Sequence, residues 1–95
     1  LTLTQLINLM CENPCRIFGI KNKGFIKEGY DADLTIVDMN KKVTIKNEMM
    51  ASKCGWTPFH NHKITGFPVC TIVNGNLVME DGKIIIKSKG KPLEF

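Results

Sequence analysis

The stretch VCTIVNGNLVMEDGKIII, residues 69–86, decides the fold class of this chain. Its three apolar runs are separated by two dipeptides, Asn74-Gly75 and Asp81-Gly82. Asn-Gly and Asp-Gly favour two-residue hairpin turns, because both turn positions tolerate positive φ. The stretch therefore predicts three antiparallel strands in a meander. The expected strands are 69–73, 77–79 and 84–86.

Further β signals lie upstream. After a turn at 29–31, residues 32–38 alternate well enough for a strand, with Leu34 and Ile36 on one face. Residues 43–45 predict a second, short strand. A loop rich in turn-forming residues is expected next. It contains Gly55, Pro58, Gly66 and Pro68.

The first 18 residues predict helix. Apolar residues recur at the i, i+3, i+4, i+7 spacing that places them on one helix face, namely Leu3, Leu6, Ile7 and Met10. Thr2 and Gln5 have the spacing of a capping box. Pro14 is expected to end this helix, because the residue before proline avoids the α region. Asn13-Pro14 then begins a second short turn that runs through Phe18 and ends at Gly19.

The composition is that of one small globular domain. The chain has 95 residues, 43% of them apolar and 23% charged, which argues against disorder. No apolar run approaches the roughly 18 residues of a membrane helix, so no membrane is expected as a partner. The net charge of +4 comes from scattered lysines and one arginine, which disfavours a nucleic-acid surface. A lysine-rich nucleic-acid binder remains the weakest alternative.

The cysteines and histidines offer little chemistry. Cysteines at 11, 15, 54 and 70 form no recognisable disulfide framework and fit a reducing, cytoplasmic setting. His60 and His62 are the first candidates for a metal site, because residues two apart in extended backbone point to the same side. A zinc site needs three or four ligands, so the pair is interpreted as surface residues. A set of Cys11, Cys15, His60 and His62 is the other conceivable combination.

Three aspartates cluster around one expected strand: Asp31, Asp33 and Asp38. Paired carboxylates can serve as acid and base, but Asp31 and Asp33 flank a strand entry, where aspartate commonly caps turns. The sequence contains no Walker loop, dinucleotide fingerprint or nucleophile elbow. We therefore assign no catalytic, substrate-binding or metal-binding residue.

Three local patterns occur in an informative order. Residues 13–19, NPCRIFG, are similar to the NPARIFGL of the cyclic amidohydrolases, and residues 24–34, GFIKEGYDADL, to that family's G-x-I-x-x-G-x-D-A-D-L. The third pattern runs from Ser52-Lys53 through Thr57-Pro58-Phe59 to residues 71–75, TIVNG. Together they resemble the C-terminal part of a dihydroorotase, while allantoinases and hydantoinases are near relatives.

The resemblance implies an architecture. The family forms a (β/α)₈ barrel with a small β-sandwich built from both ends of the chain. Residues 1–20 would then be the last barrel helices, 21–87 the C-terminal strands of the sandwich and 88–95 a tail. The expected fold class is mainly β with a short N-terminal helical segment. The implied partners are the N-terminal barrel of the same protein and further copies in a homo-oligomer.

The resemblance also implies chemistry for the whole enzyme. A hydroxide bound to zinc would attack the cyclic amide of dihydroorotate to give carbamoyl aspartate, a step of pyrimidine biosynthesis. The family's metal ligands and catalytic aspartate lie on barrel strands that this sequence does not contain, so the chain alone is expected to be inactive. His60 and His62 follow the Thr-Pro-Phe step, which is not where the family's paired histidines occur. The alternatives are a non-catalytic relict or subunit-interaction module, and another cyclic amidohydrolase.

One departure from the family pattern concerns the backbone. The family usually has glycine two residues after the phenylalanine of the Pro-Phe step, and Asn61 stands there in this chain. Asparagine adopts the left-handed conformation more readily than most other residues with a side chain. The turn is therefore expected to survive.

Overall fold

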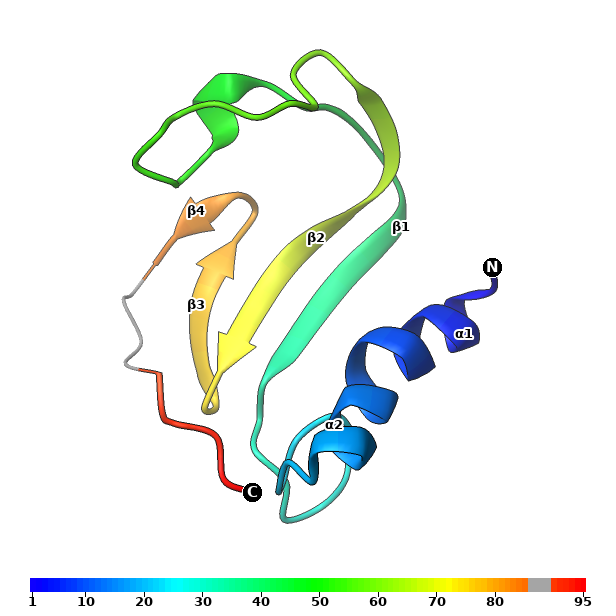
Figure 1. The fold of residues 1–95 in the computed structure, drawn as a ribbon. Coiled ribbons are helices and arrows are strands. Elements are labelled where there is room, and N and C mark those ends of the chain that lie inside the picture. Colours follow the sequence, from blue (N-terminus) through cyan, green and yellow to red (C-terminus); the bar gives the residue numbers. More distant parts are fainter. Residues whose placement is uncertain (86–89) are drawn as a thin grey trace.

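The computed structural model describes residues 1–85 and 90–95. A helical segment precedes a four-stranded antiparallel sheet with the strand order β1-β2-β3-β4 (Figure 1). The elements are α1 (Leu3–Ile7), the π-helix η1 (Asn8–Glu12), α2 (Asn13–Phe18), β1 (Leu34–Thr44), the 3₁₀ helix η2 (Asn47–Met49), β2 (Lys63–Val73), β3 (Asn76–Glu80) and β4 (Lys83–Ile84). This architecture confirms the expected class, mainly β with an N-terminal helical segment.

The helical segment is continuous from α1 to α2. The predicted capping box is present: the Gln5 N–H donates to Thr2 Oγ1 at 3.1 Å, and the Thr2 N–H donates to Gln5 Oε1 at 2.7 Å. The prediction that Pro14 ends the first helix is wrong, because Asn13 keeps helical angles (φ −62°, ψ −44°). The Asn13 N–H donates to the Asn8 carbonyl, five residues back, and this wider turn gives the proline ring room. Gly19 ends the segment at φ 65°, as predicted.

The hairpin turns of the sheet form as the sequence predicts. Asn74 and Gly75 have φ values of 49° and 77°, and Asp81 and Gly82 have 50° and 79°. These pairs of positive angles are typical of type I′ turns, which match the twist of the strands on either side. Of the third expected strand, Ile84 lies in β4 and Ile86 lies outside the described residues.

The two short strands expected at 32–38 and 43–45 are one strand, β1. Its pairing with β2 shifts between Asp38 and Lys42, where β1 carries extra residues. The Asp38 carboxylate accepts the Asn40 N–H at 3.0 Å and so satisfies a backbone donor within this bulge. Because a bulge interrupts the alternation of side chains, the sequence pattern resembles two separate strands.

The strand β2 is longer than predicted. Gly66 and Pro68 were expected in a loop, yet both lie within β2. Pro68 stands at a second register shift in the β1–β2 pairing, and proline is tolerated within a sheet at such irregular positions. Gly66 has φ 93°, an angle that glycine adopts without strain.

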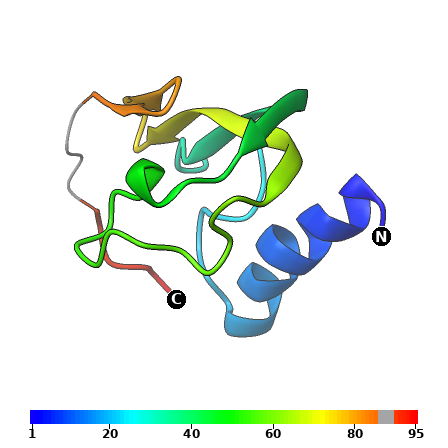
Figure 2. The same ribbon diagram turned by 90° about the horizontal axis from the view of Figure 1, so that it is seen from above.

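The described residues form no closed hydrophobic core. Thr57 is the only one of them that counts as buried, at 9% exposure. The helical segment lies on one side of the sheet without packing on any described strand (Figure 2). Its apolar positions Leu3 and Ile7 are 54% and 45% exposed, and Ile36 on β1 is 50% exposed. The helix and the sheet therefore both present uncovered apolar surface. Among residues 1–85 and 90–95, the helices are too short to carry a membrane-crossing apolar segment.

Candidate functional site

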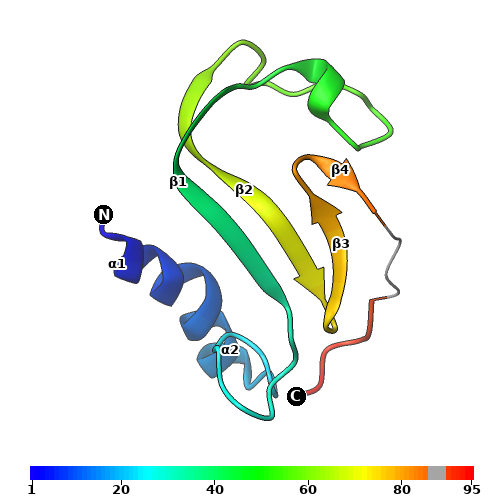
Figure 3. The same cartoon turned by 180° about the vertical axis from the view of Figure 1, so that it is seen from behind.

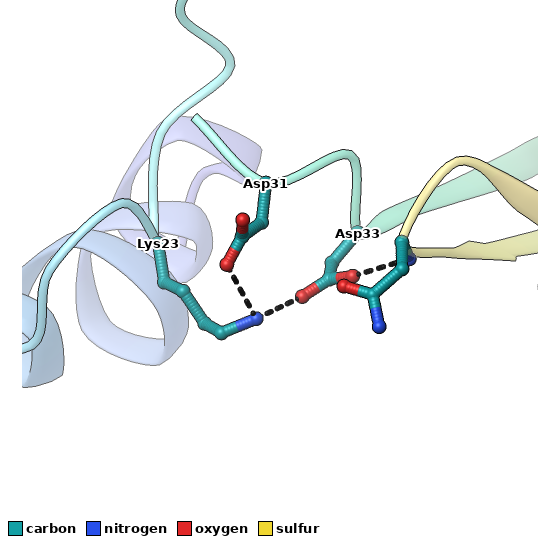
Figure 4. Close-up of polar contacts among 4 residues, drawn as sticks. Lys23, Asp31 and Asp33 are labelled. Carbon is teal, nitrogen blue, oxygen red and sulfur yellow. Dashed lines mark hydrogen bonds and ion pairs between the residues drawn. The ribbon is translucent and has the colours of Figure 1, made fainter. Parts of the chain in front are cut away.

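Two clusters of polar residues that contact one another in the structure are candidates for a functional site. The first, the Lys23 junction, joins Lys23, Asp31, Asp33 and Asn74 (Figure 4). The Lys23 Nζ lies 3.1 Å from Asp31 Oδ2 and also pairs with Asp33 Oδ2. The other oxygen of Asp33 accepts the Asn74 N–H at 2.9 Å. The junction therefore ties the loop after α2 to the start of β1 and to the β2–β3 turn.

Electrostatics keep the Lys23 junction charged. The hydrogen bond from Lys23, followed by the bond from the Asn74 N–H, lowers the pKa of Asp33. The bonds to Asp33 and Asp31 raise the pKa of Lys23. A carboxyl with a lowered pKa is a poor general acid or base near neutral pH. The geometry therefore supports a connecting role for Asp33.

The second cluster organises the Thr-Pro-Phe loop, which we define as residues 45–62. The Thr57 N–H donates to Asn47 Oδ1 at 3.0 Å, and the Asn47 N–H donates to His60 Nδ1 at 2.9 Å. The Thr57 hydroxyl accepts the Phe59 N–H at 3.2 Å. Seen from behind, the loop arches beyond the end of β1 and the start of β2, which it connects (Figure 3). Its shape therefore comes from polar bonds, in a chain that buries no apolar residue among those described.

The left-handed turn expected at Asn61 is confirmed, with φ 68°. Ile45 is bonded on both sides of this turn: its N–H donates to the His62 carbonyl at 2.8 Å, and its carbonyl accepts the Asn61 N–H at 2.6 Å. The Asn61 side chain accepts a bond from Lys46 Nζ at 2.5 Å. Asparagine thus preserves the turn and adds a contact that glycine could not make.

The histidines do not form a zinc site with other described residues. His60 Nδ1 already accepts the Asn47 N–H, and the His62 ring packs edge-on against Phe59 with 5.8 Å between centroids. Within residues 1–85 and 90–95, no three His, Cys, Asp or Glu side chains lie close enough together to hold a metal. The residues described here therefore do not fit the zinc that the family resemblance implies, and we derive no catalytic step through a metal.

The cysteines are free thiols. Cys54 is exposed, and its pKa is lowered by a hydrogen bond with Ser52, whose Oγ lies 3.2 Å from Sγ, and then by the Trp56 backbone. Cys15 packs against Gly24 so closely that a Cβ at Gly24 would lie 2.6 Å from the Cys15 sulfur.

The sequence indicates the aspartate cluster and the Thr-Pro-Phe step but not their hydrogen-bond partners. It did not single out Lys23, which lies ten residues before Asp33, or Asn47, which lies ten residues before Thr57. These contacts depend on how loops fold back, and no short spacing signals them.

Comparison with known proteins identifies the family. Residues 1–78 match the sequence model of the amidohydrolase family. The chain belongs to that family. Among curated relatives, it is 45% identical over 91 residues to a dihydroorotase of Pyrococcus furiosus and 48% identical over 91 residues to one of Pyrococcus abyssi. Each match covers 96% of this chain and 22% of the relative, so the chain spans about a fifth of the length of these relatives.

A solved structure shares the fold as well. The L-hydantoinase (dihydropyrimidinase) from Arthrobacter aurescens superposes with a TM-score of 0.84 at 35% identity. The match covers 92% of this chain and 20% of that protein. The helix-plus-sheet arrangement is therefore a recurring part of amidohydrolases, and the resemblance to dihydroorotase inferred from the three motifs is confirmed.

Proposed function

We propose that this chain is the C-terminal scaffold of a dihydroorotase, the enzyme that interconverts dihydroorotate and carbamoyl aspartate. The observation that carries the proposal is the identity of 45–48% to dihydroorotases over 96% of the chain. The proposed role is structural. Its polar clusters connect segments of the fold, and its apolar faces pack against the remaining four-fifths of the enzyme.

The uncovered surfaces support this role. The helical segment exposes apolar side chains along its length, including Leu3, Leu9 and Met10 at 54%, 58% and 70%. Burial of apolar area contributes about 25 cal/mol per Å², so such a segment is stabilised by any protein surface that covers it. We propose that residues 1–20 pack on the barrel and that residues 21–87 complete the sandwich. The boundary at 87 lies outside the described residues.

The edge of the sheet supports the same role. β1 is an edge strand of 11 residues and pairs with β2 alone among the described strands. A long, unpaired edge is a template for a further strand. We propose that a strand from the rest of the enzyme pairs with β1. The proposed cytoplasmic location and homo-oligomeric assembly follow from the same assignment.

A chimera tests the proposal. In the dihydroorotase of Pyrococcus furiosus, the 91 matched residues are replaced by this chain. We expect the chimera to hydrolyse dihydroorotate, whereas the same enzyme lacking the segment should be unstable and inactive. A folded chimera with no dihydroorotase activity would contradict the scaffold role.

A second candidate function is hydantoin hydrolysis, favoured by 36% identity over 88 residues to an L-hydantoinase of Paenarthrobacter aurescens. The test is an assay of the protein that carries this chain on dihydroorotate and on hydantoins in parallel. A preference for dihydroorotate supports the first proposal, and a preference for hydantoins supports the second.

A further inference from the structure

One imidazole completes the hydrogen-bonded framework of the Thr-Pro-Phe loop. The half-buried His60 accepts the Asn47 N–H on Nδ1 at 2.9 Å. Asn47 Oδ1 accepts the Thr57 N–H at 3.0 Å, and the Thr57 carbonyl accepts the His60 N–H at 3.2 Å. The three residues thus form a closed ring of bonds around Thr57, the most buried described residue.

The ring requires a particular protonation state. An imidazole nitrogen accepts a hydrogen bond only when it carries no hydrogen, so His60 must be neutral with its hydrogen on Nε2. Protonation places a hydrogen on Nδ1, where it faces the Asn47 N–H. The bond is then lost and two donors confront each other. We propose that His60 is a pH-responsive latch that holds the Thr-Pro-Phe loop closed when neutral and releases it when protonated.

The direction of the effect follows from this geometry. The neutral ring accepts the Asn47 N–H on Nδ1 and the protonated ring cannot, so the closed loop is favoured by neutral His60.

The other ionisable side chains of the loop and its ends are those of Lys46, Glu48, Lys53, Cys54, His62 and Lys63. Cys54 contacts Ser52 and the Trp56 carbonyl. Lys46 Nζ is bonded to the Asn61 side chain, and Glu48 lies on η2. The His62 ring packs on Phe59, and Lys63 begins β2. Among these contacts, the acceptor for the Asn47 N–H is His60 Nδ1.

The loop carries its own probe. Trp56 is the only tryptophan in the sequence and directly precedes Thr57. Its side chain is 59% exposed, and opening the ring would change its surroundings. Intrinsic fluorescence therefore reports the latch without a label.

The experiment follows Trp56 fluorescence of the full chain from pH 8 to pH 5, with far-UV circular dichroism to show that the strands persist. Three proteins are compared: wild type, H60N and H62N. The asparagine of H60N offers a carbonyl oxygen near the place of Nδ1 but does not titrate, while H62N leaves His60 as the sole histidine.

We expect a sigmoidal change in wild type and H62N and its loss in H60N, which should retain the high-pH emission throughout. An equal transition in H60N would overturn the proposal, since Glu48 or another group would then be responsible. A wild-type protein with unchanged emission, or a transition abolished only in H62N, would also overturn it.

Discussion

At the scale of single residues, the Lys23 junction places one lysine between two carboxylates. Lys23 supplies the leading contribution to the lowered pKa of Asp33, ahead of the Asn74 N–H. The negative charge on Asp33 contributes to stability above its ordinary pKa of 3.8, and that contribution is lost as the pH falls through the lower, folded-state pKa. Lys23 has a raised pKa, so its contribution is present below 10.5 and is lost as the pH rises through the folded-state value. The junction is therefore intact across the neutral range.

We predict that K23M raises the pKa of Asp33 towards its ordinary value, because the largest stabilising contact of the carboxylate is removed. The carboxyl ¹³C chemical shift of Asp33, followed during an acid titration, measures this change. K27M is the matched control, since Lys27 lies over the Tyr30 ring, 5.7 Å from its centroid. An Asp33 titration that is identical in wild type and K23M would contradict the contact.

Gly24 gives a second prediction at this scale. A Cβ there would lie 2.6 Å from the Cys15 sulfur and 2.7 Å from the Cys11 carbonyl, at φ 87°. We expect G24A to push the loop away from the helix and to increase the rate at which Cys15 is alkylated. In G29A the backbone strain is similar, at φ 85°, but no atom lies within 4 Å. Mass spectrometry of the labelled peptide should show faster Cys15 modification in G24A alone, and equal rates would contradict the close packing.

At the scale of elements, the hairpin turns could be predicted from the sequence, whereas the β1 bulge and the π-helical turn could not. Asn74-Gly75 and Asp81-Gly82 specify their conformation through their own backbone preferences, so two residues suffice to predict each turn. The bulge in β1 arises from its pairing with β2, whose residues are far away in the sequence. The π-helical turn before Pro14 arises from a shift in backbone hydrogen bonding. The capping box at Thr2 depends on residues close together in the sequence, and its prediction is confirmed.

The β2–β3 hairpin offers a test of this distinction. We expect G75A to destabilise the hairpin by about 1–2 kcal/mol, because a residue with a side chain is strained in the left-handed conformation. N74G should be close to neutral, since glycine accepts the angle and keeps the N–H that Asp33 binds. Amide hydrogen exchange in β2 and β3 measures the difference, and equal protection in the two variants would contradict the proposed role of the turn.

At the scale of the whole molecule, the dominant feature is apolar surface without a cover. The three family motifs predicted which protein family the chain belongs to, and the order of its elements followed from the same patterns. None of the described apolar residues is buried, and this could not be predicted from the sequence. Alternation and helical periodicity indicate which face of an element is apolar but not what packs on that face. The contact of Lys23 with Asp33 depends on how the chain folds in three dimensions, so the sequence pattern does not predict it either.

The uncovered faces predict self-association of the isolated chain. Exposed apolar patches and an open strand edge both favour association. Sedimentation velocity should therefore show an average mass that increases with concentration above the 10.7 kDa of one chain. A monomer that persists at high concentration would show that the chain covers these faces in another way.

We propose that this chain supplies scaffold and no catalytic group for dihydroorotate hydrolysis. The most direct measurement is the rate of dihydroorotate hydrolysis by the purified 95-residue chain, with and without added Zn²⁺. We expect a rate equal to that of the buffer in both conditions. Multiple turnovers that scale with the concentration of the chain would contradict it.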